Sequence, residues 1–330
     1  MPLIPWRFAV ALLFATSCVA YAQDLPGRGK TLQPGYEGAL EGLFQTYVVT
    51  RGLEQLGYQV KKEVLVRPAV KYVALAQGDI DFFADGWIPT QESFWKGAGG
   101  DEKLAQHGPL VANASAGYFV DKKTADKYKI RSVEQLKDPA IAKLFDTNGS
   151  GKAALYGCPQ GWGCEKRIEH HLDAYGLRNT VRHVQGEVAL LQAEVLRLHK
   201  EGQPVLFFTY SPQWLSQVLV PERDVVTLTV PFTSLPPGMT GSTTLPDGRN
   251  VGHVVNNIYI MTRKDFAQQH PAAARLFALM KIPVADVNEQ NHRIYLGEKS
   301  LEQVRGHADA WIQKNKAQFD SWLAEARRAR

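Results

Sequence analysis

The sequence predicts an α/β protein with two lobes. Between residues 40 and 84, segments with helical periodicity alternate with short apolar segments that have the pattern of strands. This alternation is typical of parallel strands joined by crossover helices. The chain has 330 residues, and its length beyond the first 22 is sufficient for two lobes that each enclose a hydrophobic core.

The N-terminal segment, residues 1–22, has the pattern of a cleaved signal peptide. An apolar run over residues 8–15 follows Arg7, and Ala20-Tyr21-Ala22 forms a small-x-small cleavage site. The apolar run is too short to anchor the protein stably in a bilayer. We therefore expect export to the periplasm and a mature chain that begins at Gln23.

The elements expected in the first part of the mature chain are a helix over residues 40–56, a strand over 58–66, a helix over 69–77 and a strand over 79–84. Gly57 and Gly78 are placed where a glycine would end each helix. Trp87 follows the second of these strands, within Asp85-Gly86-Trp87-Ile88-Pro89. Ligands of open α/β sheets bind at the carboxyl ends of the strands.

The later helices and strands are predicted from the same apolar periodicity and the same end signals. Strands are expected at residues 117–120, 205–209, 224–230 and 258–261, and helices at residues 132–136, 165–175, 188–200, 271–280 and 306–326. The continuous apolar run at residues 205–209 is typical of a buried parallel strand. Residues 236–252 are rich in Gly, Pro, Ser and Thr and predict an irregular loop.

The most distinctive stretch is the loop from Gly157 to Glu165. It places Trp162 in a Gly- and Pro-rich segment bounded by Cys158 and Cys164. Two cysteines remain after the signal peptide, and an even number in an exported chain indicates a disulfide, with two reduced thiols as the alternative. Gly163 and Cys164 would then lie at a helix N-terminus, whose free N–H groups and dipole favour an anion.

Three aromatic residues, Trp87, Trp162 and Tyr210, each lie in a segment with Gly or Pro at the end of a strand or the start of a helix. Taken singly, each is more often a core or surface aromatic than a ligand contact. Together they could surround a quaternary ammonium group, which cannot donate a hydrogen bond and is attracted by the faces of aromatic rings. Core positions are expected for the other tryptophans of the mature chain: Trp95, Trp214, Trp311 and Trp322.

Several function classes lack support. The 38 Lys and Arg and 33 Asp and Glu are interspersed, without the basic stripe of a nucleic-acid partner. Residues 146–151 copy the first half of a calcium loop, but Gly157 occupies the place of its bidentate glutamate, so a plain turn is expected. His170 and His171 have no partner at metal spacing and are expected at exposed helix positions. We expect no metal, no cofactor and no enzymatic activity; the alternative is a secreted enzyme or redox protein that uses the same cleft.

Motifs that carry a family resemblance are spread over the mature chain. They are Gly78-Asp79-Ile80-Asp81, Asp121-Lys122-Lys123-Thr124-Ala125-Asp126, Leu136-Lys137-Asp138-Pro139, Lys143-Leu144-Phe145-Asp146-Thr147-Asn148-Gly149, Gly161-Trp162-Gly163-Cys164-Glu165 and Pro283-Val284-Ala285-Asp286. With the signal peptide, they resemble the ProX family, the periplasmic glycine betaine/proline betaine-binding components of ProU-type ABC importers. The cysteine-bounded tryptophan loop is the most specific of these motifs.

The resemblance implies a type II periplasmic binding fold, in which two α/β lobes joined by a hinge enclose a ligand. The ligand-binding residues it implies are Trp87, Trp162, Tyr210, Gly163, Cys164 and Gln91. The three aromatics would surround the methylated ammonium, and the amides of Gly163 and Cys164 would bind the carboxylate. Two positions depart from the family pattern: Tyr210 replaces a third tryptophan, and Gln91 replaces a histidine that assists the carboxylate.

The expected domain organisation is lobe 1 from residues 23–116 and 250–330, and lobe 2 from residues 117–249. The resemblance also implies partners: a betaine ligand and an ABC permease driven by a cytoplasmic ATPase, with the binding protein itself a monomer. Because Tyr210 and Gln91 differ from the family pattern, a related amine such as choline or carnitine, or a sulfonate, stays open as the ligand.

Overall fold

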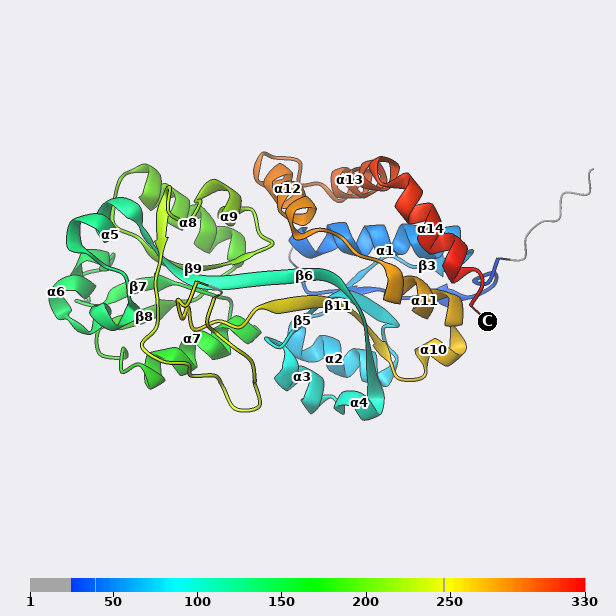
Figure 1. Cartoon of the computed structure of the whole chain (residues 1–330), viewed down its shortest axis with the longest axis horizontal. Helices are drawn as coiled ribbons and strands as arrows, with labels where there is room; N and C mark the ends of the chain where they lie inside the picture. Colours follow the sequence, from blue (N-terminus) through cyan, green and yellow to red (C-terminus); the bar gives the residue numbers. More distant parts are fainter. Residues whose placement is uncertain (1–24, 39, 246, 330) are drawn as a thin grey trace, which may run out of the picture.

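The structure is a computed structural model that describes residues 25–38, 40–245 and 247–329. The predicted signal peptide, residues 1–22, lies outside the described residues. Figure 1 shows two α/β lobes side by side, with the long strand β6 running from one into the other. In the described part of the chain, no helix has the length and apolar character needed to cross a membrane.

The main sheet extends through both lobes. Its strands, in spatial order, are β5 (Phe82–Ile88), β11 (Asn256–Arg263), β6 (Leu104–Asp121), β9 (Leu206–Ser211), β7 (Ala153–Tyr156) and β8 (Val181–Val184), and β10 (Val225–Thr227) pairs with β6. The first half of β6 pairs with β11, and its second half, from Ser115, pairs with β9. One continuous strand therefore connects the two lobes.

The strand directions correct the prediction of a parallel sheet. Strand β7 is parallel to β8 and β9, but β11 is antiparallel to both β5 and β6, and β6 is antiparallel to β9. The predicted strand at residues 117–120 is the end of this 18-residue β6. The sequence pattern did not reveal its first half because polar and small residues interrupt the apolar run there.

Helices pack around the sheet in each lobe. Lobe 1 holds α1 (Leu43–Gln55), α2 (Pro68–Gln77), α3 (Glu92–Gly97), α4 (Gly100–Lys103), α10 (Phe266–Gln269), α11 (Pro271–Leu279), α12 (Val284–Tyr295), α13 (Leu301–Lys314) and α14 (Lys316–Ala326). Lobe 2 holds α5 (Lys122–Tyr128), α6 (Pro139–Ala142), α7 (Gly163–Ala174), α8 (Val188–Lys200) and α9 (Leu215–Val218). Each lobe has its own buried apolar clusters.

Helix α12 was not predicted, and it contacts both lobes. Val287 and Ile294 on this helix are buried in the lobe 1 core. At its end, Tyr295 stacks on Trp214 of lobe 2 with ring centroids 4.4 Å apart. Asn288 accepts a hydrogen bond from the backbone N–H of Gln213 at 2.9 Å. The helix thus connects the two lobes by side-chain contacts.

The predicted strand at residues 58–66 is wrong. Two short strands occur there, β3 (Gln59–Val60) and β4 (Val64–Leu65), which pair with β1 (Thr31–Leu32) and β2 (Gly35–Tyr36) outside the main sheet. The charged residues 61–63 interrupt the apolar pattern. Between these two strands, Glu63 accepts a hydrogen bond from Tyr47 at 2.8 Å and pairs with Arg305 at 3.2 Å.

The long helix predicted at residues 306–326 is two helices that meet at Asn315. This residue leaves the helical region, with φ −106° and ψ 25°, and its side-chain amide donates to the carbonyl of Trp311 at 2.9 Å. An asparagine side chain that bonds to the backbone competes with the helix in this way.

The core prediction for Trp95, Trp214, Trp311 and Trp322 is confirmed, since each is buried.

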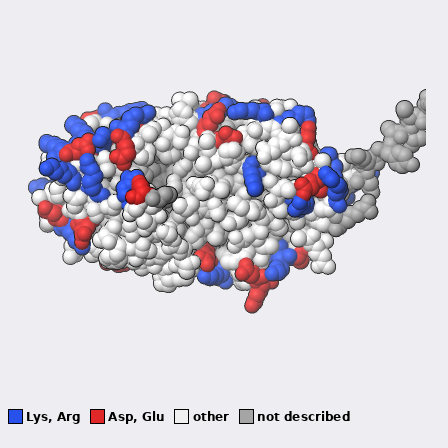
Figure 2. All heavy atoms as spheres, in the orientation of Figure 1, with Lys and Arg blue, Asp and Glu red and all other residues white. Residues whose placement is uncertain are grey.

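The charges at the surface are mixed. On the face shown in Figure 2, Lys and Arg lie among Asp and Glu near the two ends, and uncharged atoms cover most of the middle. This face carries no continuous basic stripe of the kind that a nucleic-acid backbone requires.

The expectation of exposed histidines on α7 is wrong for His171, which is 1% exposed. Its Nδ1 accepts a hydrogen bond from the Tyr118 hydroxyl at 2.8 Å, and its Nε2 donates to the carbonyl of Ser234 at 2.9 Å. Both ring nitrogens are therefore satisfied by a neutral imidazole. Burial lowers the pKa of His171 to about 3.

This burial predicts a loss of stability in acid. An unfolded histidine has a pKa of about 6.5, so the unfolded state binds the proton first as the pH falls, and the native state loses stability progressively down to the folded pKa. Between pH 7 and pH 4.5 we expect His171 to contribute a loss of about 2–3 kcal/mol. Urea denaturation at both pH values measures this change in the free energy of unfolding. The free energy of unfolding of the variant His171→Gln should fall correspondingly less between the two pH values. An equal fall in the variant would show that His171 is not the cause.

Candidate functional site

A pocket lies between the two lobes, and all six ligand-binding residues predicted from the sequence line it. Its lining comprises Glu37, Gly42, Gln45, Asp85, Trp87, Thr90, Gln91, Ala116, Trp162, Gly163, Cys164, Arg167, Phe208, Tyr210, Pro212 and Asn256. Elements of both lobes therefore contribute to one site. The ligand-binding roles of the six residues stay predictions.

The aromatic residues come to the pocket from separate elements. Trp87 lies within β5 and Tyr210 within β9, each at a half-buried position, rather than after a strand as predicted, because pairing with neighbouring strands extends both. Their rings meet edge to face, with centroids 5.5 Å apart and an interplanar angle of 82°. Trp162 immediately precedes α7. The three rings thus approach the pocket from both lobes.

The cysteine-bounded loop has the predicted form. Cys158 and Cys164 are joined by a disulfide, and α7 begins at Gly163 with Trp162 as its N-cap residue and no side chain capping its amides. The N-terminal amides of a helix favour an anion. Gly163 is required by packing across the cleft, because a Cβ there would lie 2.6 Å from the carbonyl oxygen of Thr90.

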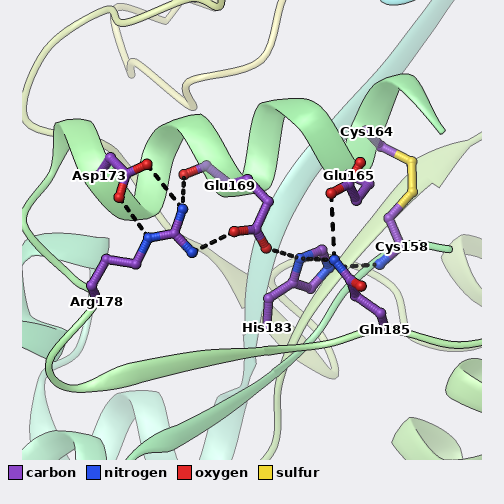
Figure 3. A network of polar contacts seen from close by, with 8 residues as sticks. All are labelled: Cys158, Cys164, Glu165, Glu169, Asp173, Arg178, His183 and Gln185. Atoms are coloured by element: carbon purple, nitrogen blue, oxygen red, sulfur yellow. Dashed lines mark hydrogen bonds and ion pairs between the residues drawn. A yellow bond between two sulfur atoms is a disulfide. The ribbon is translucent and has the colours of Figure 1, made fainter. Parts of the chain in front are cut away.

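A polar network holds this loop against β8 (Figure 3). The backbone N–H of Cys158 donates to His183 Nε2 at 3.0 Å, so the proton of the neutral ring is on Nδ1, which contacts Glu169 at 2.7 Å. Glu169 also pairs with Arg178, which in turn pairs with Asp173. Burial lowers the pKa of His183 and keeps this tautomer neutral. The network fixes the position of the disulfide, and with it the start of α7.

Gln91 lies in the wall of the pocket at 4% exposure, and its carboxamide is engaged within lobe 1. Its Oε1 accepts hydrogen bonds from the Tyr72 hydroxyl at 2.9 Å and from the backbone N–H of Trp87 at 3.2 Å. Its Nε2 donates to Glu37 at 3.1 Å. The direct contact from Gln91 to a ligand carboxylate stays a prediction; the contacts of Gln91 in the structure orient Trp87.

Sequence reasoning missed a buried ion cluster on the same wall. Lys71 is fully buried, and its Nζ lies 2.8 Å from Glu37 Oε2 and 2.5 Å from Asp85 Oδ1. Burial alone lowers the pKa of Lys71, but the charges of Asp85 and Glu37 outweigh it and the net shift is upward. Burial raises the pKa of Glu37. Glu37, Lys71 and Asp85 are far apart in the sequence, so the sequence did not reveal that they form a cluster. Only Asp85, two residues before Trp87, lies in a segment that was predicted to border the ligand site.

Arg167, one helical turn after Gly163, was also missed. It is 1% exposed, its Nη2 donates to the Thr90 hydroxyl of lobe 1, and its Nη1 lies 3.1 Å from His253 Nδ1. Its Nε has no partner in the described part of the chain, and no acidic side chain there forms an ion pair with it. Burial lowers the pKa of Arg167 to about 10, so the guanidinium is charged at neutral pH.

The pocket therefore combines groups of opposite character. Aromatic rings and the carboxylates of Glu37 and Asp85 line it together with the amides at the start of α7 and the guanidinium of Arg167. Such a pocket matches a small molecule with a cation at one end and an anion at the other.

No group of three or more His, Cys, Asp or Glu suited to a metal occurs among the described residues. In the turn that resembles half of a calcium loop, the carboxylate of Asp146 accepts backbone N–H groups of its own turn.

Comparison with known proteins identifies close relatives. Residues 30–314 match the family described as the substrate binding domain of the ABC-type glycine betaine transport system. The chain is 48% identical over 322 residues to the glycine betaine-binding periplasmic protein OusX of Dickeya dadantii (strain 3937). It is also 48% identical over 319 residues to the glycine betaine/proline betaine-binding periplasmic protein of Escherichia coli (strain K12). Each match covers 97% of both chains.

Solved structures share the fold. An ABC-transporter choline binding protein in complex with choline aligns with a TM-score of 0.70 and 19% identity, over 89% of this chain and 91% of that chain. The predicted type II periplasmic binding fold, with two α/β lobes around a cleft, is confirmed by this likeness.

Proposed function

The chain belongs to the family of substrate-binding domains of ABC-type glycine betaine transport systems, and from this premise we propose that its cleft captures glycine betaine and proline betaine. The observation that carries the proposal is the arrangement of the pocket. The side chains of Trp87, Trp162 and Tyr210 line the pocket together with a helix N-terminus and a buried arginine.

The aromatic rings suit the methylated ammonium. This group has no proton to donate, and its charge is attracted by the negative faces of aromatic rings, with about 0.5–2 kcal/mol from each. A tyrosine face is weaker than a tryptophan face but serves the same purpose. Tyr210 therefore supports the same ligand class as the tryptophan that it replaces in the family pattern.

Other groups that line the pocket suit a carboxylate. The amides of Gly163 and Cys164 would donate to it, and Arg167, whose Nε has no partner among the described residues, would add a charged donor. Hydrogen bonds to charged groups contribute about 1.5–3 kcal/mol each. Together with the aromatic contacts, two such bonds are consistent with binding in the micromolar range, about −8 kcal/mol.

The remaining features of the proposal follow from the family. We propose that the chain is a periplasmic monomer that delivers its ligand to an ABC permease with a cytoplasmic ATPase, uses no cofactor and catalyses no reaction. We further propose lobe 1 as residues 23–116 plus 250–330 and lobe 2 as residues 117–249. The change of partner strand along β6, between Ala114 and Ser115, supports the first boundary.

Fluorescence titration tests the ligand. Because Trp87 and Trp162 line the pocket, a bound ammonium should change the emission of the protein. We expect saturable changes with glycine betaine and proline betaine and none with proline, which lacks the methyl groups. Choline and carnitine are the competing candidates. Saturation by choline alone would identify a receptor for an amine without a carboxylate, and recovery of an altered ligand would identify an enzyme.

A further inference from the structure

A histidine side chain of β8 holds the first residue of the cysteine-bounded loop (Figure 3). The backbone N–H of Gly157 donates to the carbonyl of Val184 at 3.0 Å and continues the pairing of β7 with β8. The next N–H, of Cys158, donates to Nε2 of His183 at 3.0 Å. The loop is therefore attached to the sheet through an imidazole at the point where the strand ends.

This contact is close and buried. A Cβ on Gly157 would lie 2.1 Å from His183 Nε2, so the glycine leaves the room that the ring occupies. The side chain of His183 is 3% exposed, and Cys158 is 1% exposed. A buried backbone N–H needs an acceptor, and His183 supplies it to Cys158.

The position of Cys158 is passed on to the ligand site. Its disulfide partner, Cys164, lies in the first turn of α7, and the amides of Gly163 and Cys164 are those proposed to bind the ligand carboxylate. Trp162 lies within the same closed loop and lines the pocket. A movement of Cys158 would therefore move both the anion-binding amides and one aromatic ring.

The contact requires an unprotonated Nε2. In the neutral ring of His183 the proton is on Nδ1, which donates to Glu169 at 2.7 Å, and Nε2 is free to accept. A second proton would be placed on Nε2 and would point at the N–H of Cys158. Two donors would then face each other, and a buried N–H without an acceptor is unfavourable. The imidazolium is thus incompatible with the observed position of the loop.

The groups around the ring set when it is protonated. Burial lowers the pKa of His183, and the charge of Arg178 acts in the same direction. The carboxylates of Glu169 and Glu165, both on α7, oppose this shift without outweighing it. Gln185, whose amide lies 3.4 Å from Nδ1, is uncharged. The ring is therefore neutral, and the loop is held, at neutral pH.

We propose that His183 is a positioning residue of the ligand site, which holds the disulfide loop in its binding geometry only while Nε2 is unprotonated. This inference rests on the proposed function, because it assigns a pH dependence to the capture of betaine. The proton and the ligand favour different states of the loop. The affinity for betaine therefore falls below the pKa of His183, by up to about tenfold per pH unit.

Calorimetric titration with glycine betaine from about pH 7.5 to about pH 4.5, at pH values where circular dichroism shows the native fold, tests the proposal. The ligand keeps both of its charges over this range, so a change in affinity comes from the protein. We expect a constant affinity near neutral pH and a fall of about threefold or more at the acid end. An affinity that is constant over the whole range would overturn the proposal.

Two variants assign the pH dependence. His183→Gln keeps an uncharged acceptor for Cys158 that is not protonated, so it should retain the affinity at neutral pH and lose the acid fall. Burial raises the pKa of Glu37, which also lines the pocket, but any fall due to Glu37 remains in this variant. His183→Leu removes the acceptor and should weaken binding about tenfold at every pH. His183→Gln carries the test if His183→Leu does not fold.

His199→Gln is the matched control. The Nε2 of His199 donates to the carbonyl of Asp224 at 3.3 Å, at the end of α8, and His199 is not part of the pocket lining. Its pH profile should equal that of the wild type. An equal acid fall in the wild type and His183→Gln, or an unchanged affinity of folded His183→Leu, would refute the role of His183. If the wild type binds no betaine at neutral pH, the proposed function fails, and this inference fails with it.

Discussion

Replacing Trp162 by alanine should weaken the binding of glycine betaine by about 1–3 kcal/mol, roughly 5- to 150-fold. Trp162 lies within the loop that the disulfide closes, directly before α7, where its ring lines the pocket and contacts the lobe 2 core only in part. Its removal takes away one cation–π face while the disulfide and the helix remain. Calorimetric titration of the folded variant measures the loss.

Trp311→Ala is the control for this variant. Trp311 is 7% exposed in the lobe 1 core, its Nε1 donates to Asp286 at 2.8 Å, and its ring packs edge-on against Phe44. Its truncation should lower the free energy of unfolding by about 3–5 kcal/mol and leave the affinity of the folded protein unchanged. Equal affinities of the wild type and Trp162→Ala would remove Trp162 from the ligand site.

Replacing Arg167 by methionine should weaken the binding of glycine betaine by about 2–5 kcal/mol. Methionine retains much of the buried apolar volume but leaves the ligand carboxylate without its charged donor. The contact from Arg167 to Thr90, across the cleft, is lost as well. Calorimetry with the wild type and the variant gives the difference.

Choline separates these two effects of Arg167, because it has the trimethylammonium but no carboxylate. If Arg167 binds the carboxylate, Arg167→Met should weaken betaine binding far more than any binding of choline. An equal loss for both ligands would assign Arg167 to closure of the lobes alone. Arg167→Lys, which keeps a charge but loses the planar fork, should restore part of the betaine affinity.

The sequence predicted the aromatic part of the pocket better than its charged part. Trp87, Trp162 and Tyr210 were recognisable because Gly and Pro residues mark the segments around them. Lys71 and Arg167 look like ordinary surface charges of helices, and their burial depends on elements distant in the sequence. Asp85 was visible beside Trp87, but its pairing with Lys71 depends on how α2 packs on β5.

In the fold, too, features that depend on local sequence patterns were predicted better than features that depend on contacts between distant segments. Helix α8 was predicted at its observed bounds because its apolar residues recur with helical spacing and Gly202 follows its end. The strands at residues 117–120 and 258–261 were predicted, but the full 18-residue length of β6 and the antiparallel direction of β11 were not, because strand direction and pairing depend on contacts between distant segments. The break at Asn315 depends on one side-chain hydrogen bond, which periodicity does not reveal.

Calorimetric titration of the oxidised mature chain with glycine betaine, proline betaine and proline tests the proposed function most directly. We expect saturable binding of the two methylated zwitterions in the micromolar range and no binding of proline, because only a methylated ammonium fills a pocket of aromatic faces. Absence of binding by both betaines at millimolar concentration, or proline binding as tightly as they do, would contradict a betaine receptor.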